Sequence, residues 1–505
     1  MRLLPALLLI LFAGCGPSGS SGLTITNVLI VDGTGAPPRA GAVRIVGDSI
    51  AAVGDLEPAA GDERYDGGGL VLAPGFIDTH SHHDQGLLAA PDAVPVVSQG
   101  VTTIIAGQDG GQPWPLAPML DSLGAAPPAV NVGFYAGHNT IRAAVLGDDF
   151  RRPATAAEVD SMSTLLRREL AAGALGLSTG LEYDPGINSN RAEVLALARV
   201  AAAAGSRYLS HIRSEDRWFW DAIDEIIAIG REAKLPVQVS HMKLAMVPLW
   251  GATDSLFGVL DRARAAGVDI TADVYPYTYW QSTLQVLFPN RDFDNRAEAE
   301  KVLREIARPE GLLIGDFAAH PAYGGRTVAE IAAERHEDPA TTLMALIRES
   351  IAWEKAHPDS GGSESVVATS MTEPDVDRLL AWPHANVSSD GALDGAHPRG
   401  YGAFPRFLGR MVRERQVVSL AEAVRKMTSL AADHAGLARR GRIEPGYHAD
   451  LTLFDPESVI DHATPREPHL LSTGIERVWV NGVVVWDGER ATGRHPGRVL
   501  RRGAR

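Results

Sequence analysis

Four histidines and one aspartate each follow a short apolar run of the sequence, and together they could bind a metal ion. His80 and His82 are two residues apart, so on an extended segment both imidazoles point to the same side. His211 and His241 each end a further run, and Asp390 ends the last one. Imidazole nitrogens and a carboxylate oxygen are typical ligands of a divalent cation, and this set favours Zn²⁺.

Such a centre would carry out hydrolysis. Zinc lowers the pKa of a bound water toward ~7, which supplies hydroxide at neutral pH. Asp390 could bind the metal, accept the proton of that water and later deliver it to a leaving amine. A second metal or a polar side chain would polarise the carbonyl oxygen. The residues therefore predict a hydrolase that cleaves an amide.

A barrel of alternating strands and helices would bring these five side chains together. Strand-like runs alternate with helical stretches over residues 74–435, for example helices over 156–172, 191–204 and 218–233. Eight such units predict an α/β fold, a TIM-like (β/α)8 barrel, in which the carboxyl ends of all strands face one pocket. A doubly wound parallel sheet is the alternative topology. The eight predicted strands cover residues 75–79, 102–106, 130–136, 174–179, 208–211, 237–241, 270–274 and 386–389.

Both ends of the chain have an all-β pattern. Short apolar runs and turns fill residues 23–73, and a matching pattern returns over residues 436–505 with an Asn481-Gly482 turn, a strong hairpin signal. We therefore predict one small β-sandwich domain built from both ends, followed by a C-terminal tail. Residues of about 285–365 break the alternation with extra helices and are predicted to form an insertion over the barrel mouth.

The first 22 residues are predicted to be a lipoprotein signal peptide and tether. An apolar run too short to span a bilayer is followed by small residues and Cys15, which resembles a bacterial lipobox. Residues 16–22 read as a flexible tether. We expect an exported protein anchored to the membrane through a lipid on Cys15, on the periplasmic or cell-surface side. Ordinary secretion with an incidental cysteine is the alternative.

The composition describes a globular protein and argues against a nucleic-acid partner. Hydrophobic residues make up 45% and charged residues 22% of the 505 residues, which is close to the globular average. The chain has 47 basic and 62 acidic residues, a net charge of −15, whereas phosphate binding needs a basic surface. A single cysteine excludes an intramolecular disulfide framework and any zinc finger.

Two stretches of the chain resemble the amidohydrolase superfamily. Residues 74–82 resemble its opening motif, and residues 441–451 resemble the motif with which the chain re-enters the β domain. Within that superfamily the sequence is most similar to the N-acyl-D-amino-acid deacylases (D-aminoacylases), over about residues 23–502. The motifs similar to this branch lie at residues 100–103, 137–142, 176–181, 210–213, 275–277, 389–391, 397–399, 404–406 and 496–500.

This resemblance implies metal-dependent hydrolysis of the N-acyl amide of N-acyl-D-amino acids, with one or two Zn²⁺ ions and Asp390 as general base and acid. Two other functions stay open. An amidohydrolase of the same barrel could be a dipeptidase or a cyclic amidase that acts on peptide-like amides, including those with D-amino acids. A non-catalytic surface binding protein is the second, although the intact histidines and Asp390 weigh against it.

One position departs from the pattern of the family. The D-aminoacylases carry a cysteine metal ligand in a Gly-Asn-Cys-Gly turn after the second strand, where residues 107–110 of this chain read Gly-Gln-Asp-Gly. Asp109 could supply an oxygen ligand instead, or Glu182, after the fourth strand, could bridge two metals. We favour Glu182, because other amidohydrolases place a carboxylated lysine or a glutamate there. A carboxylate in place of a thiolate makes the ligand set harder, so Mn²⁺ or Co²⁺ could substitute for zinc.

Five further residues lie near predicted strand ends and are candidate contacts of a small acyl-amino-acid substrate. Lys243 and Arg399 could pair with a substrate carboxylate, the arginine through its fork geometry. Tyr183, Tyr275 and Tyr277 could donate hydrogen bonds to the substrate. Structural ion pairing and packing under a loop are the respective alternatives.

Overall fold

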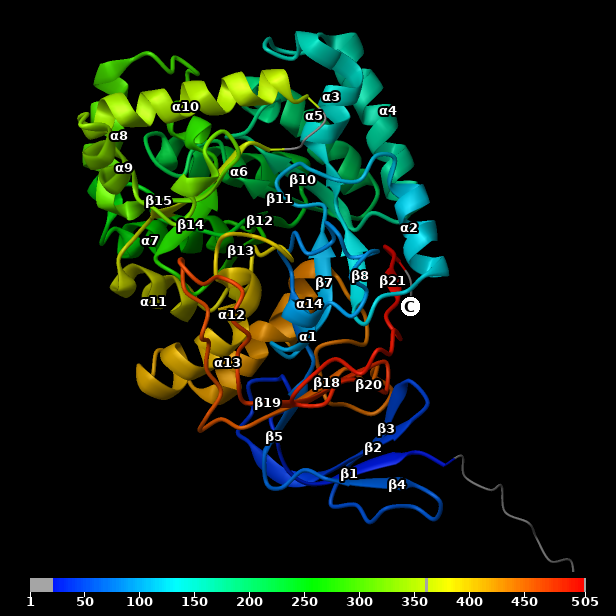
Figure 1. Ribbon diagram of the computed structural model, residues 1–505. Coiled ribbons are helices and arrows are strands. Elements are labelled where there is room, and N and C mark those ends of the chain that lie inside the picture. Colours follow the sequence, from blue (N-terminus) through cyan, green and yellow to red (C-terminus); the bar gives the residue numbers. More distant parts are fainter. Residues whose placement is uncertain (1–20, 359–361, 504–505) are drawn as a thin grey trace, which may run out of the picture.

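The computed structural model describes residues 21–358 and 362–503, so Cys15 and the predicted signal peptide lie outside the described residues. Figure 1 shows a barrel of strands and helices between two added parts, a β domain at one end and a helix-rich insertion at the other. No helix within the described ranges has both the length and the apolar character that crossing a bilayer would need.

The predicted (β/α)8 barrel is confirmed, and the doubly wound alternative is excluded. Strands β8 and β9 follow one another and act as one barrel strand, since β8 pairs with β7 and β9 pairs with β10, in both cases in parallel. The barrel strands are β6 (Phe76–Asp78), β7 (Val101–Ala106), β8 (Asn131–Phe134) with β9 (Ala136–Gly137), β10 (Gly176–Gly180), β11 (Arg207–His211), β12 (Val237–Val239), β13 (Ile270–Val274) and β17 (Ala385–Val387).

The barrel closes between its first strand, β6, and its last, β17. A parallel bridge joins Ser81 to Gly391, and the Asp390 N–H donates to the His80 carbonyl at 2.8 Å. Just below, the Asp78 carboxylate accepts hydrogen bonds from the Ser389 N–H at 2.9 Å and from the Ser389 hydroxyl. These groups are buried, so the bonds satisfy polar atoms that would otherwise be costly to remove from water.

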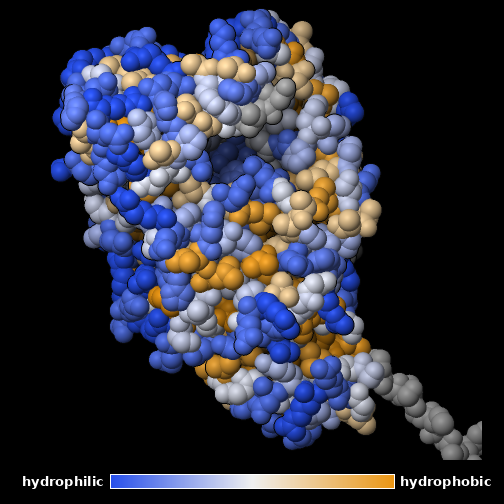
Figure 2. Space-filling view, viewed as in Figure 1, coloured by the Kyte–Doolittle hydropathy of each residue, from blue (hydrophilic) through white to orange (hydrophobic). Residues whose placement is uncertain are grey.

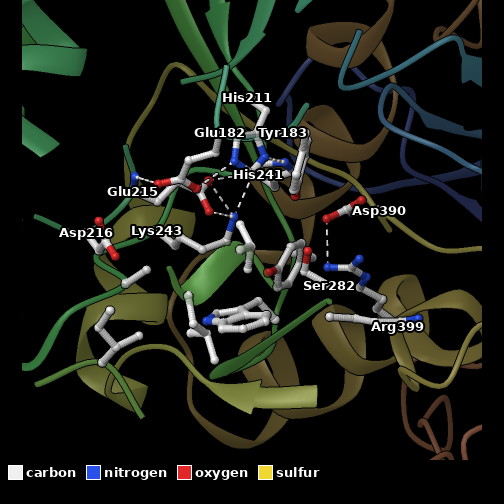
Figure 3. A pocket seen from close by; sticks show the side chains of 17 residues that line it. Glu182, Tyr183, His211, Glu215, Asp216, His241, Lys243, Ser282, Asp390 and Arg399 are labelled. Atoms are coloured by element: carbon white, nitrogen blue, oxygen red, sulfur yellow. Dashed lines mark hydrogen bonds and ion pairs between the residues drawn. The ribbon is translucent and has the colours of Figure 1, made fainter. Parts of the chain in front are cut away.

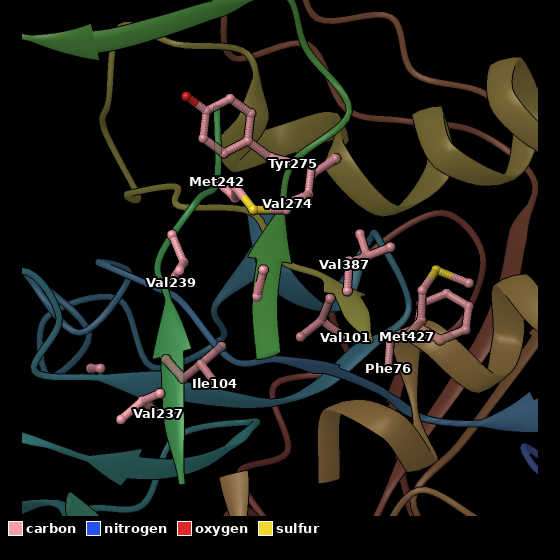
Figure 4. Close-up of a cluster of buried hydrophobic side chains, with 14 of the residues drawn as sticks. Phe76, Val101, Ile104, Val237, Val239, Met242, Val274, Tyr275, Val387 and Met427 are labelled. Atoms are coloured by element: carbon pink, nitrogen blue, oxygen red, sulfur yellow. The ribbon is translucent and has the colours of Figure 1, made fainter. Parts of the chain in front are cut away.

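The apolar core fills the barrel and the space between its strands and helices. Figure 4 shows part of it, with Val237 and Val239 on β12 close to Ile104 of β7. The covering helices bury one face each; α6, for example, buries Ile223, Ile226 and Ile227. These helices and the shorter ones near the barrel are α1 (Val94–Val97), α2 (Leu116–Ala125), α3 (His138–Leu146), α4 (Ala156–Ala172), α5 (Arg191–Ala203), α6 (Phe219–Ala233), α7 (Thr253–Ala265), α11 (Glu373–Ala381), α12 (Arg399–Arg406), α13 (Leu420–Met427) and α14 (Ser429–Ala435).

The β domain is one continuous sheet to which both ends of the chain contribute. Antiparallel pairing of β5 with β18 joins the two halves, and a bridge between Ser49 and His448 shows that the sheet folds back on itself. The expected sandwich therefore has a core between two halves of a single sheet, rather than between two separate sheets. Its strands are β1 (Leu23–Ile30), β2 (Arg39–Val46), β3 (Ser49–Gly54), β4 (Glu63–Asp66), β5 (Val71–Pro74), β18 (Leu451–Phe454), β19 (Ile475–Val480) and β20 (Val483–Trp486).

The insertion has its own small sheet and its own apolar core. Its strands β14 (Tyr279–Ser282), β16 (Glu364–Thr369) and β15 (Leu312–Phe317) pair antiparallel in that order. It therefore begins before the expected residue 285, because β14 pairs with β16 rather than with the barrel. Its helices are α8 (Arg296–Glu305), α9 (Val328–Arg335) and α10 (Pro339–Ala356), and they bury residues such as Leu284, Phe288 and Ile347.

The last strand of the chain belongs to the barrel and not to the β domain. After β20 the chain crosses back, and β21 (Val499–Leu500) pairs in parallel with the beginning of β8, Val499 opposite Val132. The Arg502 N–H then donates to the Gly173 carbonyl, which precedes β10. The tail thus fills the gap at the base of the barrel between β8 and β10.

Candidate metal centre

The predicted metal-ligating residues meet at the carboxyl ends of the barrel strands. His80 and His82 follow β6, His211 is the last residue of β11, and His241 and Asp390 follow β12 and β17. His80, His211, His241 and Asp390 are at most 5% exposed. The structure therefore brings these side chains from distant parts of the chain into one buried cluster.

The first group of potential ligand atoms lies around the first and last barrel strands. The Nε2 atom of His80 is 3.4 Å from both Asp109 Oδ2 and Asp390 Oδ1. The Nε2 atom of His82 lies 3.2 Å and 3.3 Å from the same two oxygens. Two imidazoles and two carboxylates thus converge with atoms close enough to share one cation.

The second group lies beside the first and uses the other oxygen of the same aspartate. The Nδ1 atom of His211 is 3.0 Å from the Nε2 atom of His241. That His241 nitrogen is 3.3 Å from Asp109 Oδ1. The Asp109 carboxylate therefore stands between the two groups, with one oxygen facing each of them.

The position of Asp109 favours this residue over Glu182 as the bridge between the two groups, although Glu182 also lies near potential ligands, with His211 and Glu215. Glu182 Oε2 accepts a hydrogen bond from His211 Nε2 at 2.9 Å, and its Oε1 accepts from the Glu215 N–H at 2.9 Å. Both oxygens are thus held on the far side of His211, away from His80 and His82. The carboxylate lies beside the second group but does not reach the first.

The turn that carries Asp109 explains why this side chain points into the cluster. Asp109 has a φ of 53°, and the next residue, Gly110, has a φ of 76°. A Cβ atom on Gly110 would lie 2.2 Å from Asn139 Oδ1, so only glycine fits there. The hydroxyl of Ser178 on β10 accepts from the Gly110 N–H at 3.3 Å and holds the turn against the barrel.

Three residues of the cluster have left-handed backbone conformations. The φ angles are 53° for Asp109, 34° for His241 and 52° for Asp390. Non-glycine residues seldom adopt such angles, and they persist where the surrounding structure imposes them, often at functional sites. Here the turn at the end of each strand redirects the side chain toward the common centre.

The donor atoms fit a bound cation. Asp109 Oδ1 and both ring nitrogens of His80 are buried and form no hydrogen bond within the described residues. Burial alone lowers the pKa of His82, yet the Asp109 and Asp390 carboxylates raise it to about 9. The carboxylates of the cluster therefore carry more negative charge than the neighbouring side chains neutralise. A divalent cation would supply the positive charge that neutralises the rest.

Two glutamates orient the histidines of the second group. Glu182 accepts from the Nε2 atom of His211, while Glu215 Oε1 lies 2.9 Å from Nδ1 of His241. Each histidine therefore has one nitrogen against a carboxylate and the other facing the cluster, which is the usual arrangement around metal-binding histidines. The sequence analysis missed Glu215, although it stands only four residues after His211.

Asp273 is a second group that the sequence analysis missed. It is fully buried on β13, accepts a hydrogen bond from the His241 N–H at 2.9 Å, and lies 3.6 Å from Nδ1 of His80. An acid between Ala272 and Val274 of a buried strand was the available signal, because a buried carboxylate without partners is rare.

The two candidate cations of the substrate site are both engaged by carboxylates. Lys243 Nζ lies 2.7 Å and 2.8 Å from the oxygens of Glu215, and Arg399 Nη1 lies 2.7 Å from Asp390 Oδ2. Figure 3 shows both pairs on the wall of one pocket. The ring of Tyr275 lies beneath both cations, 4.8 Å from the Arg399 guanidinium carbon and 5.6 Å from Lys243 Nζ.

The three candidate tyrosines differ in their position. Tyr183 lines the cavities on both sides of Asp390, and Tyr275 lines one of them with a buried hydroxyl that has no partner in the described residues. Tyr277 lies outside both cavities, which corrects its predicted contact with the substrate. Its ring packs against His397 and Arg406, and its hydroxyl lies 3.5 Å from the Pro398 carbonyl.

A buried arginine holds the loop that carries Glu182 and Tyr183. Arg142 is fully buried, pairs with Glu193, and donates from Nε to the Pro185 carbonyl at 3.1 Å. A charge buried in this way is stable only when it is fully paired, so the network fixes the loop after β10. The motif at residues 137–142 therefore stabilises the loop that carries Glu182 and Tyr183.

The cluster opens toward the insertion. Figure 2 shows a hollow on this face of the molecule, with mostly hydrophilic residues around it. A cavity of about 650 Å³ is lined by His82, Asp109 and Asp390 from the barrel and by Ser282 and Glu364 from the insertion. A substrate can thus reach the cluster between the barrel and the insertion.

Comparisons with known proteins identify the family to which the chain belongs. A profile described as the amidohydrolase family matches residues 63–385 and 374–486. The chain is 38% identical over 506 residues to an N-acyl-D-glutamate deacylase of Alcaligenes xylosoxydans xylosoxydans, covering 95% of this chain and 97% of that protein. A D-aminoacylase of the same organism is 36% identical over 507 residues, covering 95% and 98%.

The fold is shared with a solved relative as well. The crystal structure of N-acyl-D-glutamate deacylase from Bordetella bronchiseptica, complexed with zinc and a phosphonate inhibitor, matches with a TM-score of 0.84. The two chains are 35% identical, and the match covers 95% of this chain and 100% of the other. The resemblance drawn from the motifs is confirmed, and the chain belongs to the amidohydrolase family, in the group that contains the N-acyl-D-amino-acid deacylases.

Proposed function

We propose that this protein is a metal-dependent hydrolase that cleaves the N-acyl amide bond of N-acyl-D-amino acids. The observation that carries the proposal is the Asp109 carboxylate, which lies between two groups of ligand atoms at the barrel mouth, with Asp390 beside it. The names of the relatives supply the substrate class, because the two most similar proteins described above are an N-acyl-D-glutamate deacylase and a D-aminoacylase.

The two groups would hold one or two Zn²⁺ ions. One group offers His80, His82, Asp109 and Asp390, and the other offers Asp109 with the two histidines that follow β11 and β12. Bound zinc would supply a Lewis acid that activates water and polarises an amide carbonyl. Since Asp109 contributes oxygen where the D-aminoacylase pattern has sulfur, Mn²⁺ or Co²⁺ should also be accepted.

Asp390 is placed to transfer a proton from the attacking water to the leaving nitrogen. Its Oδ1 faces His80 and His82, while its Oδ2 is held by Arg399 at 2.7 Å. Arg399 keeps the carboxylate ionised, since burial raises the pKa of Asp390 but the neighbouring guanidinium and imidazoles lower it well below its usual range. An ionised carboxylate can accept a proton from the attacking water and return it to the leaving nitrogen.

Arg399 is the cation best placed to bind the substrate carboxylate, because the three donors of the Lys243 ammonium group already contact Glu215 and His241. Lys243 and Arg399 line one pocket together with Tyr275, and the Arg399 Nε has no hydrogen-bond partner within the described residues. A planar guanidinium with a free N–H can donate a hydrogen bond to a substrate carboxylate while its Nη1 stays paired with Asp390. This arrangement would fix the amino-acid half of the substrate next to the proton-transferring group.

We further propose that the protein is exported and anchored to a membrane by a lipid on Cys15. The support is the sequence itself, in which a short apolar run and small residues precede the only cysteine of the chain. No metal ligand or catalytic group is proposed for this residue, so it is free to serve as an anchor.

The function is tested by assaying the purified protein with N-acetyl-D-methionine and N-acetyl-L-methionine. We expect release of D-methionine, loss of that activity after treatment with a chelator, and recovery on addition of Zn²⁺, Mn²⁺ or Co²⁺, because the ligand groups require a cation. Absence of hydrolysis with every metal would favour a non-catalytic binding protein. Equal turnover of both enantiomers would contradict the assignment to D-amino acids.

Asp390→Asn should lower kcat by about 10²- to 10⁴-fold, because the amide cannot accept the proton of water. The variant keeps an oxygen toward His80 and His82, so the protein should retain most of its metal. The measurements are steady-state kinetics and elemental analysis of the same preparation. A kcat close to that of the wild type would show that another group moves the proton.

Asp109→Ala should remove more bound metal than Glu182→Ala. Asp109 faces both ligand groups, whereas Glu182 contacts the outer nitrogen of His211 and the Glu215 N–H. Metal content per protein after dialysis, measured by mass spectrometry, checks the order. The opposite order would return Glu182 to the bridging position.

Cys15→Ser should release the protein from the membrane fraction of an expressing bacterium. The wild type should incorporate radiolabelled palmitate and the variant should not, because a hydroxyl does not form the thioether that carries the lipid. A wild-type protein that stays unlabelled and soluble would rule out the anchor.

A further inference from the structure

A cavity of about 170 Å³ lies at the base of the barrel, at the end opposite the metal centre. Its walls come from the segment that precedes β10, from residues that follow α14, and from the segment that carries β21. Figure 1 shows β21 beside the barrel, above β2 and β3 of the β domain. Since a water molecule occupies about 30 Å³ in the liquid, the cavity has room for a phosphate group.

The polar lining of this cavity is basic. The basic side chains that line it are Arg440, His448, Arg498 and Arg501, and no acidic residue among the described ones does so. The other lining residues are glycine, alanine, leucine and valine. An arginine binds phosphate through parallel N–H donors of its planar guanidinium group. The lining therefore suits a small anion.

The acids that pair with these arginines lie outside the lining and leave donors free. Asp450 pairs with Nη1 of Arg440, and Asp48 accepts from Nη1 of Arg498 at 2.6 Å. The Nε atoms of both arginines have no hydrogen-bond partner within the described residues. The side chains of Arg498 and Asp48 are 47% and 38% exposed, so their pair contributes little stability and can rearrange around an anion.

The chain enters the β domain next to the same cavity. A Cβ atom on Gly22 would lie 2.2 Å from the Ile45 carbonyl oxygen, so the start of β1 lies against the end of β2. The turn that follows β2 carries Asp48, the partner of Arg498, and the first residue of β3 bridges to His448. The entry of the chain and two side chains of the cavity therefore lie around one turn.

This position limits the distance between the cavity and a membrane. Gly22 follows the proposed lipid-bearing Cys15 by seven residues, and a chain of that length spans at most about 25 Å. The surface of the membrane would then lie within that distance of the start of β1. Because the cavity lies beside this strand, the anchored protein can bring it onto the lipid headgroups.

The local charge of the chain is also reversed in this region. The whole chain has a net charge of −15, whereas residues 490–505 contain six arginines and no acidic residue. Positive charge that is concentrated in one part of an acidic protein attracts anions to that part. An anionic lipid surface attracts arginine-rich segments in the same way.

We infer that the cavity at the base of the barrel binds the phosphate of an anionic lipid headgroup, with Arg498 and Arg501 as exposed donors and Arg440 as the buried one. Binding would hold the base of the barrel against the membrane and leave the metal centre, at the other end, open to soluble substrates. The inference rests on the proposed lipid anchor, which brings the cavity to a membrane.

Sedimentation with lipid vesicles tests this inference on the full-length Cys15→Ser protein, which cannot carry the lipid. The probes are vesicles of phosphatidylcholine alone and vesicles of an equal mixture of phosphatidylcholine and phosphatidylglycerol. We expect binding to be about tenfold stronger for the anionic vesicles, although the protein is acidic, because several arginines face the headgroups. High salt should remove the difference. The apolar run near the N-terminus is present with both kinds of vesicle.

The combination of Arg498→Gln and Arg501→Gln should abolish the preference, because it removes both exposed donors. Lysine at the same two positions should restore part of it, since lysine keeps the charge without the planar fork. The matched control combines Arg304→Gln and Arg348→Gln, two exposed arginines of the insertion, and should leave the preference unchanged. Arg498→Gln alone serves as a second variant if the double variant does not fold, and it should also lower the preference.

Three results would overturn the inference. The first is equal binding of both vesicles by the Cys15→Ser protein, and the second is a preference that survives in the folded glutamine variants. The third is calorimetric binding of inorganic phosphate without any preference for anionic vesicles, which would make this a site for free phosphate. A wild-type protein that takes up no palmitate would overturn the anchor alone, because the vesicle assay does not use that lipid.

Discussion

Closure of the barrel between β6 and β17 is the constraint on which the active centre depends. The two strands lie more than 300 residues apart in the chain, with a separation of 311 between Asp78 and Ser389. The same backbone hydrogen bonds that join them run directly through the ligand residues, from the Asp390 N–H to the His80 carbonyl and from the His82 N–H to the Gly391 carbonyl. Formation of the barrel and formation of the first ligand group are therefore one event.

A second constraint is the balance of charge at the mouth of the barrel. Asp109, Asp273, Asp390, Glu182 and Glu215 gather within one end of the barrel, and burial makes each of their charges expensive. Lys243 and Arg399 compensate Glu215 and Asp390. The Asp109 carboxylate forms ion pairs only with imidazoles within the described residues, and a metal ion between the two ligand groups would balance its charge.

The sequence allowed the prediction of those features that rest on local pattern. His80 and His82 were identifiable because side chains two residues apart on an extended segment point to the same side. The turn at Asn481-Gly482 was likewise predictable, and both residues have positive φ angles in the structure. The remaining ligands were predicted because they end strands, and a barrel brings strand ends together.

Features that depend on distant contacts could not be predicted in this way. Glu182 and Asp109 both stand after barrel strands, and the sequence does not tell which carboxylate points inward. That choice depends on the left-handed turn at Asp109, which Ser178 and Asn139 hold from other parts of the chain. The sheet of the insertion was also underestimated, since β14 becomes a strand only by pairing with β16, about 80 residues later.

The placement of β21 makes the barrel depend on a segment that follows the β domain in the sequence. The beginning of β8 pairs with Val499 and Leu500 on the side away from β7. Without β21, the backbone groups on that edge of β8 would have no strand partner, and an open sheet edge of this kind can pair with another chain. The segment that carries β21 therefore protects the barrel from edge-to-edge association.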